Sequence, residues 1–499
     1  MATLVSGIKT SMPKLIASPG DRRRDMRRSG LCLYFHYAVS ALVLIGLSRT
    51  ATSAEPLALH PKNPHYFLFR GKPAILVTSG EHYGAVLNLD FDYRKYLATL
   101  AGDGLNLTRT FTGAYVEPVG AFKIERNTLA PSAGRFICPW ARSDTPGYVN
   151  GGARFDLTRW DDAYFRRLKD FVAKADERGI IVELNLFTPM YEQPQWDYSP
   201  MKSSNNVNGI GKVGKHEVYT TDKEPALLEV QETMVRKIVT ELNDFDNLYY
   251  EICNEPYFGG VTRDWHDRIT DVIVGAEKAL PKKHLISWNV ANDYAKVKDP
   301  HPAISIINFH YARSAAVTDN YGLNKVLGLN ETGFKGTGDD YYRRQAWEFL
   351  LAGGGLYNNL DYSFCVGHED GMFSVKAPTP GGGSPKLRRQ LRLLAEFLRK
   401  FDFIRMKPAK DLVGGVPKAV AFQVLAESGK QYAIYLGSTK EVHLQLQLPK
   451  GTYEGEWLDT VSGQYVKLPR LDHAGDKLTI EPPEFAEECA LRLVIKSEE

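Results

Sequence analysis

Two glutamates in this sequence each follow an apolar run that is typical of a buried strand. The first, Glu255, lies in Asn254-Glu255-Pro256 at the end of the run NLYYEICNEP (247–256). Proline cannot donate a hydrogen bond to a neighbouring strand, so the strand is expected to end there. The second, Glu331, ends the run KVLGLNETG (325–333). Carboxyl groups at two strand ends are what the cleavage of a glycosidic bond requires, so this pair is our candidate for catalysis.

Cleavage with retention of configuration needs two carboxyl groups with different protonation states. One must be ionised to act as nucleophile, and the other must be protonated near neutral pH to act as acid, which requires a raised pKa. The two groups must lie roughly 5–5.5 Å apart. Glu81 and Asp361 also end predicted strands and are the rival candidates for these roles.

Polar residues near other strand ends are candidates for supporting roles. Arg109, on a predicted second strand, would keep Glu331 anionic, with an ordinary structural ion pair as the alternative. His310 and Tyr311 follow another strand and would donate hydrogen bonds to the nucleophile, with core packing as the alternative. Asn254 has the length to bond a sugar hydroxyl next to the reacting carbon.

Further candidates for sugar binding lie beside these strand ends and in two long loops. His82 and Glu81 follow the first strand, and Tyr362 follows the last one. Residues 113–157 and 188–224 are long insertions, which are more often functional than accidental. Trp140 and Trp196, one in each insertion, are candidate platforms for a sugar ring, and core packing is the favoured alternative for both.

The segments that must position these residues alternate between strand and helix. Besides the run that ends at Asn254, strand-like segments cover 73–78, 105–111, 180–187, 284–290, 303–309, 325–330 and 355–360. Helical spacing of apolar residues covers 90–100, 161–178, 225–242, 264–280, 341–352 and 386–401. This alternation predicts parallel strands in a (β/α)8 barrel, also called a TIM barrel, with the candidate residues at one mouth. A doubly wound open sheet is the alternative, but SGEHYGAV (79–86) is no glycine-rich phosphate loop.

The last part of the chain has a different pattern. From about Met406, segments such as AVAFQVL, QYAIYLG and CALRLVI alternate apolar and polar residues and are separated by turn residues. We expect a small antiparallel β-sandwich domain over 406–499 that packs on the barrel domain of 55–405. A carbohydrate-binding role for this domain is the less favoured alternative.

Residues 1–54 have the features of an export leader. The basic stretch RRRDMRR (22–28) precedes a mainly apolar segment over 31–47, and small residues follow up to Ala54. The apolar segment is a little short for a membrane span of about 20 residues, so we favour a cleaved signal peptide over an anchor helix. We therefore expect a secreted, periplasmic or cell-surface protein with no stable membrane span after cleavage.

Composition excludes several other classes of protein. The net charge is +3, but outside the leader 54 basic residues face 57 acidic ones, so nothing suggests a nucleic-acid partner. The five cysteines are scattered and show neither a disulfide framework nor metal-ligand spacing. We expect buried free thiols, no metal and no cofactor. The sequence does not indicate an oligomeric state.

The motifs resemble those of the clan A glycoside hydrolases, especially the family-five cellulase-like group, over roughly residues 60–405. YEICNEP (250–256) is similar to that clan's strand-four motif, and NETG (330–333) is similar to the site of the strand-seven nucleophile. The resemblance implies that Glu255 is the acid/base and Glu331 the nucleophile. Arg109 matches the strand-two arginine of the clan, and the trailing β domain is similar to the small sandwich of many such enzymes.

Two departures from the family pattern leave the substrate open. The clan often ends strand eight with a tryptophan, but here the region reads YNNLDYSF (357–364), so Tyr357 or Tyr362 would take its place. His310 and Tyr311 are adjacent, whereas the usual pattern spaces them by one residue. Endo-glucanase, mannanase and exo-glycosidase activities all remain open.

The sequence thus predicts a secreted retaining β-glycoside hydrolase that acts on a plant or microbial poly- or oligosaccharide. Two alternatives fit the same sequence. One is a non-catalytic carbohydrate-binding or adhesion protein on a barrel scaffold, which the altered end of strand eight suggests. The other is a transglycosylase, which would use the same residues but pass the sugar to another sugar instead of water.

Overall fold

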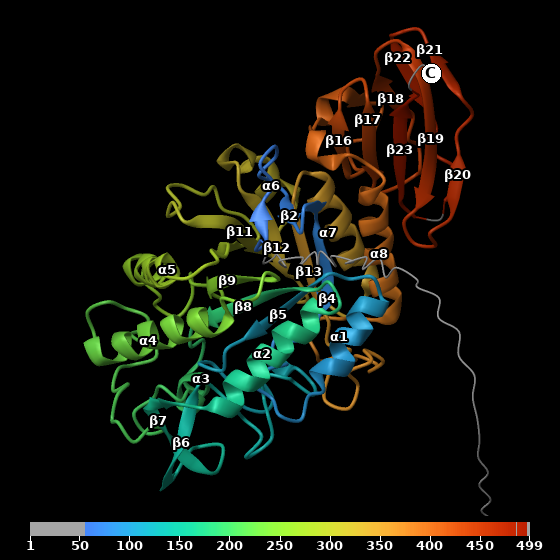
Figure 1. Cartoon of the computed structure of the whole chain (residues 1–499). Helices are drawn as coiled ribbons and strands as arrows, with labels where there is room; N and C mark the ends of the chain where they lie inside the picture. Colours follow the sequence, from blue (N-terminus) through green and yellow to red (C-terminus); the bar gives the residue numbers. More distant parts are fainter. Residues whose placement is uncertain (1–54, 486, 497–499) are drawn as a thin grey trace, which may run out of the picture. The chain divides into compact units, whose positions relative to one another are not determined.

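The fold is a barrel of eight parallel strands surrounded by helices and followed by antiparallel sheets (Figure 1). The computed structural model describes residues 55–485 and 487–496. The predicted leader, with Cys32, lies outside these residues. The prediction of a (β/α)8 barrel followed by antiparallel β structure is confirmed.

The barrel strands pair in the order β4-β13-β12-β11-β10-β9-β8-β5. Their bounds are β4 (Leu76–Gly80), β5 (Leu107–Phe111), β8 (Ile181–Phe187), β9 (Leu248–Cys253), β10 (Ile286–Asn292), β11 (Ile304–His310), β12 (Val326–Glu331) and β13 (Leu356–Leu360). All these pairings are parallel, so the carboxyl ends of the strands meet at one mouth, where such barrels place their active sites.

Asn106 joins the two strands at the ends of this order. Its backbone N–H donates to the carbonyl of Val77 at 3.2 Å, and its side-chain oxygen accepts from the N–H of Val77 at 2.8 Å. Its side-chain amide also donates to the carbonyl of Ile75. These bonds hold β5 against β4, so the sheet is nearly closed into a barrel.

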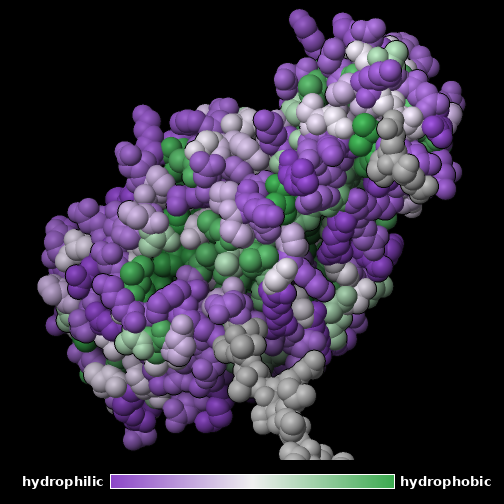
Figure 2. All heavy atoms as spheres, turned by 45° about the horizontal axis from the view of Figure 1, so that its top comes forward, coloured by the Kyte–Doolittle hydropathy of each residue, from purple (hydrophilic) through white to green (hydrophobic). Residues whose placement is uncertain are grey.

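The helices cover the outside of the barrel and bury one face each. The longer ones are α1 (Tyr93–Gly102), α2 (Asp162–Asp176), α4 (Pro225–Leu242), α5 (Arg263–Lys278), α7 (Asp339–Leu351) and α8 (Pro385–Arg399). In α2, Phe165, Leu168 and Val172 recur at helical spacing on the buried face, and Asp161 caps the first turn. Hydrophilic residues cover most of the face seen in Figure 2, and hydrophobic residues gather near its centre.

Two predictions about these elements need correction. Pro73 belongs to β3 (Lys72–Ala74), which pairs with β2 (Phe67–Phe69) in a small antiparallel sheet with β1 (Ala58–Leu59), and the first barrel strand starts at Leu76. β3 is an edge strand of that sheet, where proline's missing N–H is tolerated. The alternation of strand and helix also breaks after β10, because residues 293–303 contain no helix.

The two long insertions contain structure of their own. The first forms a hairpin of β6 (Trp140–Pro146) and β7 (Ala153–Trp160), and the second contains the short helix α3 (Gln193–Tyr198). Another short helix, α6 (Ser314–Thr318), connects β11 to β12. Both insertions start directly after barrel strands, β5 and β8, so they rise from the mouth of the barrel.

The strands that follow Met406 form two antiparallel sheets, as predicted. The larger sheet contains β14 (Lys407–Pro408), β16 (Phe422–Glu427), β17 (Gln431–Leu436), β19 (Gly451–Asp459), β20 (Tyr465–Lys467), β21 (Leu471–His473) and β23 (Cys489–Ile495). The smaller sheet contains β15 (Val413–Gly414), β18 (Leu444–Gln447) and β22 (Lys477–Ile480). Arg343 of α7 is buried and pairs with Glu487 at 2.6 Å and Glu488 at 2.5 Å, and Trp347 stacks on Tyr435. These contacts support the packing role that we expected.

Two smaller predictions can be compared with the described residues. Cys138, Cys253, Cys365 and Cys489 are buried free thiols, which confirms that prediction. No helix in the described part of the chain has the length and the apolar character needed to cross a bilayer.

Candidate active site

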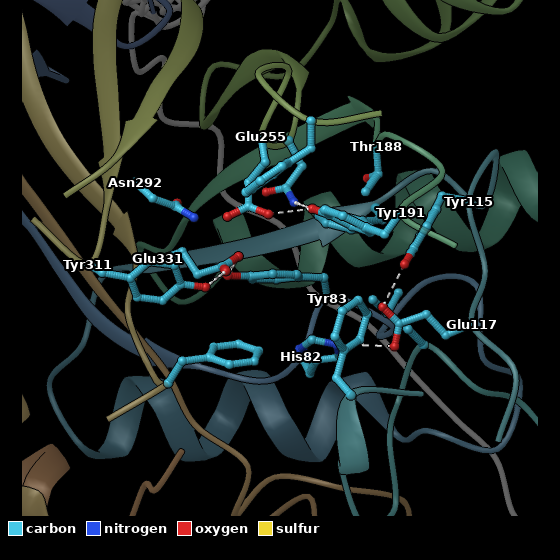
Figure 3. A pocket seen from close by; sticks show the side chains of 16 residues that line it. His82, Tyr83, Tyr115, Glu117, Thr188, Tyr191, Glu255, Asn292, Tyr311 and Glu331 are labelled. Atoms are coloured by element: carbon cyan, nitrogen blue, oxygen red, sulfur yellow. Dashed lines mark hydrogen bonds and ion pairs between the residues drawn. The ribbon is translucent and has the colours of Figure 1, made fainter. Parts of the chain in front are cut away.

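The mouth of the barrel contains a cavity of about 290 Å³ that both candidate glutamates face (Figure 3). Glu331 is the last residue of β12, and Glu255 is the second residue after β9. One carboxylate oxygen of Glu255, one of Glu331 and a ring nitrogen of His310 all lie within 4.8 Å of one another. Both glutamates are more than 90% buried. The fold thus brings together two acids that are far apart in the sequence.

Glu331 accepts hydrogen bonds from three side chains. The hydroxyl of Tyr83 lies 2.9 Å from Oε2, Nη1 of Arg109 lies 3.2 Å from the same oxygen, and the hydroxyl of Tyr311 lies 2.5 Å from Oε1. Such a set of donors suits an ionised carboxylate, which accepts hydrogen bonds and donates none. The structure therefore places Arg109 and Tyr311 where the sequence analysis expected them.

Glu255 has a separate set of donors. Tyr191 donates to Oε2 at 2.6 Å, and Nδ1 of His310 lies 3.0 Å from Oε1. Burial raises the pKa of Glu255, but the hydrogen bonds from His310 and Tyr191 and the charge of His310 outweigh burial and hold this pKa below its ordinary value. The prediction that His310 donates to the nucleophile is wrong in this structure, because Nδ1 is 3.5 Å from Glu331 and closer to Glu255.

Arg109 is fully buried at the centre of a polar network below the cavity. Nη2 donates to Glu251 and, at 2.7 Å, to the side-chain oxygen of Asn254. Nε lies 3.7 Å from Glu183. Arg109 therefore fixes both Glu331 and the neighbour of Glu255, which a flexible point charge could not do.

The side-chain amides of two asparagines bridge the carboxyl groups of Glu183 and Glu251, which lie beneath Arg109. Asn308 and Asn330 each donate to Oε1 of Glu183 and to Oε2 of Glu251, at 2.6–3.0 Å. Burial raises the pKa of Glu183 well above its ordinary value. Burial also acts to raise the pKa of Glu251, but the charge of Arg109 outweighs it and the pKa is lowered. The pair therefore favours a protonated Glu183 beside an ionised Glu251, which faces Arg109.

Three aromatic residues predicted near the sugar lie outside the cavity lining. Trp140 and Trp196 are 0% and 1% exposed, and Nε1 of Trp196 donates to the carbonyl of Val213. Both indoles fill the core beneath the insertions and cannot stack on a sugar ring. Tyr362 packs behind His82, with ring centroids 5.6 Å apart. Tyr357, the other possible substitute for the missing tryptophan, is fully buried and donates to the carbonyl of Tyr342.

The rival carboxyl groups have structural roles. Asp361 accepts from Arg388 at 2.8 Å and from Ser79 at 2.9 Å. Glu81 is fully buried and accepts from the backbone N–H groups of Gly84 and Ala85. The prediction that Glu81 contacts the substrate is therefore wrong, because its carboxyl group points into the protein.

Glu81 also contacts Thr128, and this contact favours the protonated form of Glu81. The Thr128 hydroxyl lies 2.6 Å from Oε2 of Glu81 and 2.8 Å from the carbonyl of His82. A hydroxyl has one hydrogen and can donate to one of these groups, so a protonated Glu81 satisfies the other contact. Burial, opposed by the hydrogen bonds from Thr128, Ala85 and Gly84, raises the pKa of Glu81 to about 7.

Several cavity residues were not predicted from the sequence. Tyr83 and Tyr191 bond the two glutamates, Asn292 and Phe334 line the cavity, and Glu117 faces it from the first insertion. Tyr83 directly follows His82, which also lines the cavity, so its position next to a strand end was the signal that was missed. Glu117 lies deep within an insertion that has no periodicity, and nothing in the sequence distinguishes it.

The donor atoms of Glu255, His310 and Glu331 could in principle converge on one cation. The guanidinium of Arg109 lies 3.2 Å from Glu331 and adds a positive charge that opposes a metal ion there. The same atoms already form hydrogen bonds within the site, so the arrangement suits proton transfer better than metal binding.

Comparisons with known proteins agree with this fold. The family model of the cellulases (glycosyl hydrolase family 5) matches residues 135–319, a segment that contains Glu255 and ends before Glu331. The solved structure of a glycoside hydrolase is 12% identical with a TM-score of 0.61, and the match covers 89% of this chain and 98% of that chain. A glycoside hydrolase family 5 protein from Bacteroides vulgatus ATCC 8482 is 11% identical with a TM-score of 0.60, covering 88% and 93%. No curated protein matches the chain.

At these identities the solved structures show the common fold, and the family model adds the sequence signature. The predicted resemblance to the family-five group is confirmed. The chain is a glycoside hydrolase on a (β/α)8 barrel, and its residues 135–319 match the cellulase model of glycosyl hydrolase family 5.

Proposed function

We propose that this glycoside hydrolase cleaves β-glycosidic bonds with retention of configuration, with Glu331 as the nucleophile and Glu255 as the acid/base. One observation carries the proposal: carboxylate oxygens of the two residues approach within 4.8 Å. Retaining enzymes place their carboxyl groups about 5–5.5 Å apart, whereas inverting enzymes need about 6.5–9.5 Å to admit a water molecule between the general base and the sugar.

In the first step, Glu331 attacks the anomeric carbon and a protonated Glu255 gives its proton to the leaving oxygen. A bond forms between Glu331 and the sugar while the glycosidic bond breaks. Tyr311, Tyr83 and Arg109 hold the attacking carboxylate in place. Fixed donors of this kind cost no reorganisation when the charge moves.

In the second step, Glu255, now ionised, takes a proton from water, and this water attacks the anomeric carbon. The bond to Glu331 breaks, and the sugar leaves with its original configuration. His310 and Tyr191 stabilise the ionised form of Glu255 and so favour this step. One hydrogen of the Asn254 amide bonds Tyr191 at 2.7 Å, and the other would serve the hydroxyl beside the reacting carbon.

The substrate that we propose is a plant or microbial glycan that the protein meets outside the cytoplasm. The proposal of export rests on the leader features of residues 1–54 in the sequence. A protein tagged at its C-terminus and found in the culture medium, the periplasm or at the cell surface would support it, whereas a wholly cytoplasmic protein of full length would contradict it.

The replacement Glu331→Ala tests the mechanism. The variant should lose hydrolysis of β-linked aryl glycosides, and added sodium azide should restore release of the aryl group. Azide then enters the space of the missing carboxylate and displaces the aryl group in one step. One displacement inverts the configuration of the anomeric carbon, so the product should be the α-glycosyl azide. Glu396→Ala, at an exposed pair with Arg392, is the matched control. Undiminished hydrolysis by Glu331→Ala would contradict the proposal.

A further inference from the structure

A second polar group faces the cavity at the end away from the two catalytic candidates (Figure 3). Glu117 is 3% exposed, and its oxygens accept from Tyr115 at 2.9 Å and from Asn127 at 2.5 Å. Each carboxylate oxygen has two acceptor positions, so one remains on each oxygen.

His82, beside Glu117, has unused hydrogen-bonding capacity. The residue is 7% exposed and lines the cavity, and in the described part of the chain neither ring nitrogen has a hydrogen-bond partner. Nε2 lies 3.5 Å from Oε2 of Glu117, beyond an ordinary hydrogen bond. Buried polar groups are nearly always paired, so this imidazole points to a ligand that supplies a hydroxyl.

The wall that carries Glu117 is fixed to the barrel. The N–H of Glu117 donates to the carbonyl of Leu129 at 2.9 Å, which joins the two arms of the loop. The hydroxyl of Thr128 donates to the carbonyl of His82 at 2.8 Å, and Asn88 donates to the carbonyl of Thr128 at 3.0 Å. This end of the cavity is therefore bounded by a loop that hydrogen bonds hold in place.

Phe122, at the tip of the same loop, reaches both sides of the mouth. Its ring meets Tyr191 at 5.6 Å and Phe334 at 6.5 Å between centroids. Tyr191 follows β8 and Phe334 follows β12, and three strands separate these two in the barrel order. Phe122 has a φ of 53°, in the left-handed region that a bulky side chain rarely adopts, so the loop holds it there against backbone strain.

The rim of the cavity beside Glu255 carries the half-exposed rings of Tyr257 and Phe258, which are 37% and 43% exposed. Phe122, on the loop of Glu117, is 37% exposed. The acid must protonate the leaving oxygen, so the leaving group departs on the side of Glu255. The sugar that stays on the enzyme must then occupy the end that Glu117 and His82 line.

We infer that the cavity accepts the terminal sugar of a glycan and that Glu117 and His82 bind the hydroxyls at the far end of this sugar. The inference rests on the proposed function and narrows it to exo-action. A volume of about 290 Å³ lies at the lower end of the range of about 300–1,000 Å³ for small-ligand pockets, as one sugar unit requires. In this arrangement Glu117 and His82 lie where an internal unit of a chain would have to continue.

Product analysis on the wild-type protein is the first test. A panel of 4-nitrophenyl β-D-glycosides (glucoside, mannoside, galactoside and xyloside) identifies the sugar, and a β-linked hexasaccharide of that sugar then serves as substrate. We expect the monosaccharide from the first time point and no early fall in the viscosity of the matching polymer. Early release of intermediate lengths, or cleavage of polymers alone, would overturn exo-action while leaving the proposed function intact. No product from any of these substrates would contradict the proposed function itself.

The second test concerns Glu117. We expect Glu117→Gln to lower kcat/KM for the aryl glycoside about 10- to 100-fold, the loss expected for hydrogen bonds to a charged group. Glu125→Gln, an exposed residue of the same loop, is the control and should leave kcat/KM unchanged. An unchanged kcat/KM in Glu117→Gln would contradict the assignment.

Deoxy analogues distinguish direct contact from a structural role of Glu117. The wild type should strongly discriminate against at least one of the 3-, 4- and 6-deoxy aryl glycosides, and Glu117→Gln should lose that discrimination. If Glu117 had only a structural role, Glu117→Gln would lower kcat/KM for all the deoxy analogues by the same factor. If the wild type hydrolysed all the deoxy analogues at equal rates, this result alone would overturn the inference.

Discussion

Oxygens of Glu255 and Glu331 lie within 4.8 Å of each other across the mouth of the barrel, although β9 and β12 are not adjacent strands. His310, at the end of β11, lies beside both, with Nδ1 3.0 Å from Glu255 and 3.5 Å from Glu331. At this separation Glu331 can reach the anomeric carbon itself, and no room is left for a water molecule between Glu331 and the sugar.

Replacing Glu255 should have an effect that depends on the leaving group. Glu255→Ala removes the proton donor, so kcat/KM for glycosides with poor leaving groups should fall about 10²- to 10⁴-fold. The leaving group of a 2,4-dinitrophenyl glycoside needs no protonation, so the rate of the first step should be nearly unchanged for these substrates. A plot of log kcat/KM against the pKa of the leaving group checks this. Equal losses for all leaving groups would assign Glu255 another role.

The pH dependence should differ between the free protein and the complex. His310 and Tyr191 hold the pKa of Glu255 below its ordinary value in the free protein. A bound sugar removes water from the carboxyl group, and desolvation raises its pKa. Activity needs the protonated form, so the basic limb of kcat/KM should lie at lower pH than the basic limb of kcat.

His310→Asn provides the matched variant for this pH test. It removes the ring and its charge, so the pKa of Glu255 should rise and the basic limb of kcat/KM should move to higher pH. Profiles measured with one aryl glycoside across the pH range check both statements. A shift of the limb to lower pH would contradict this account of Glu255.

Arg109 should not be replaceable by lysine. One ammonium group cannot bond Glu251, Asn254 and Glu331 in the geometry of the guanidinium fork. We expect Arg109→Lys to lower kcat about 10²- to 10³-fold. Arg109→Met should also cost about 3–5 kcal/mol in the free energy of unfolding, because it leaves buried carboxylates unpaired. Arg94→Lys, at an exposed pair with Asp170, is the control for both measurements.

Glu81 should make stability depend on pH. Burial raises its pKa to about 7 in the folded protein, against about 4.3 for an exposed glutamate. The folded state holds the proton more tightly, so this stabilisation is complete below about pH 4.3 and is lost as the pH rises to about 7. Relative to Glu81→Gln, the wild type should lose about 3 kcal/mol of unfolding free energy over this range. Parallel pH profiles from urea unfolding of the two proteins would contradict this role.

The sequence was sufficient for the barrel and for the position of two carboxyl groups at its mouth, because these follow local rules. Apolar segments with strand or helix spacing formed the predicted elements, and Glu255 and Glu331 lie at strand ends where a parallel barrel exposes side chains. Errors arose where a local rule was overridden. Pro73 was assigned to the first barrel strand, but it lies in β3, an edge strand that pairs with β2 and ends at Ala74, before the barrel strand begins at Leu76.

The insertions limited the prediction of the site. Trp140 and Trp196 have the side chains that sugar platforms use, but each is buried within the core. Whether a loop aromatic faces a ligand or the core depends on contacts distant in the sequence. Glu117 could be recognised as a candidate only from the fold, which places it in the lining of the cavity. Glu81 is no longer a candidate for substrate binding, because its carboxyl group is buried against Thr128.

The most direct test of the central claim is to trap the sugar on its nucleophile. A 2-deoxy-2-fluoro-β-glycosyl fluoride of the sugar that the panel identifies should form a slowly hydrolysed ester with the enzyme. Mass spectrometry of the digested protein should then find the added mass on Glu331 and nowhere else. Attachment to Glu255 or Glu117, or turnover of the reagent with inversion and no adduct, would contradict the account.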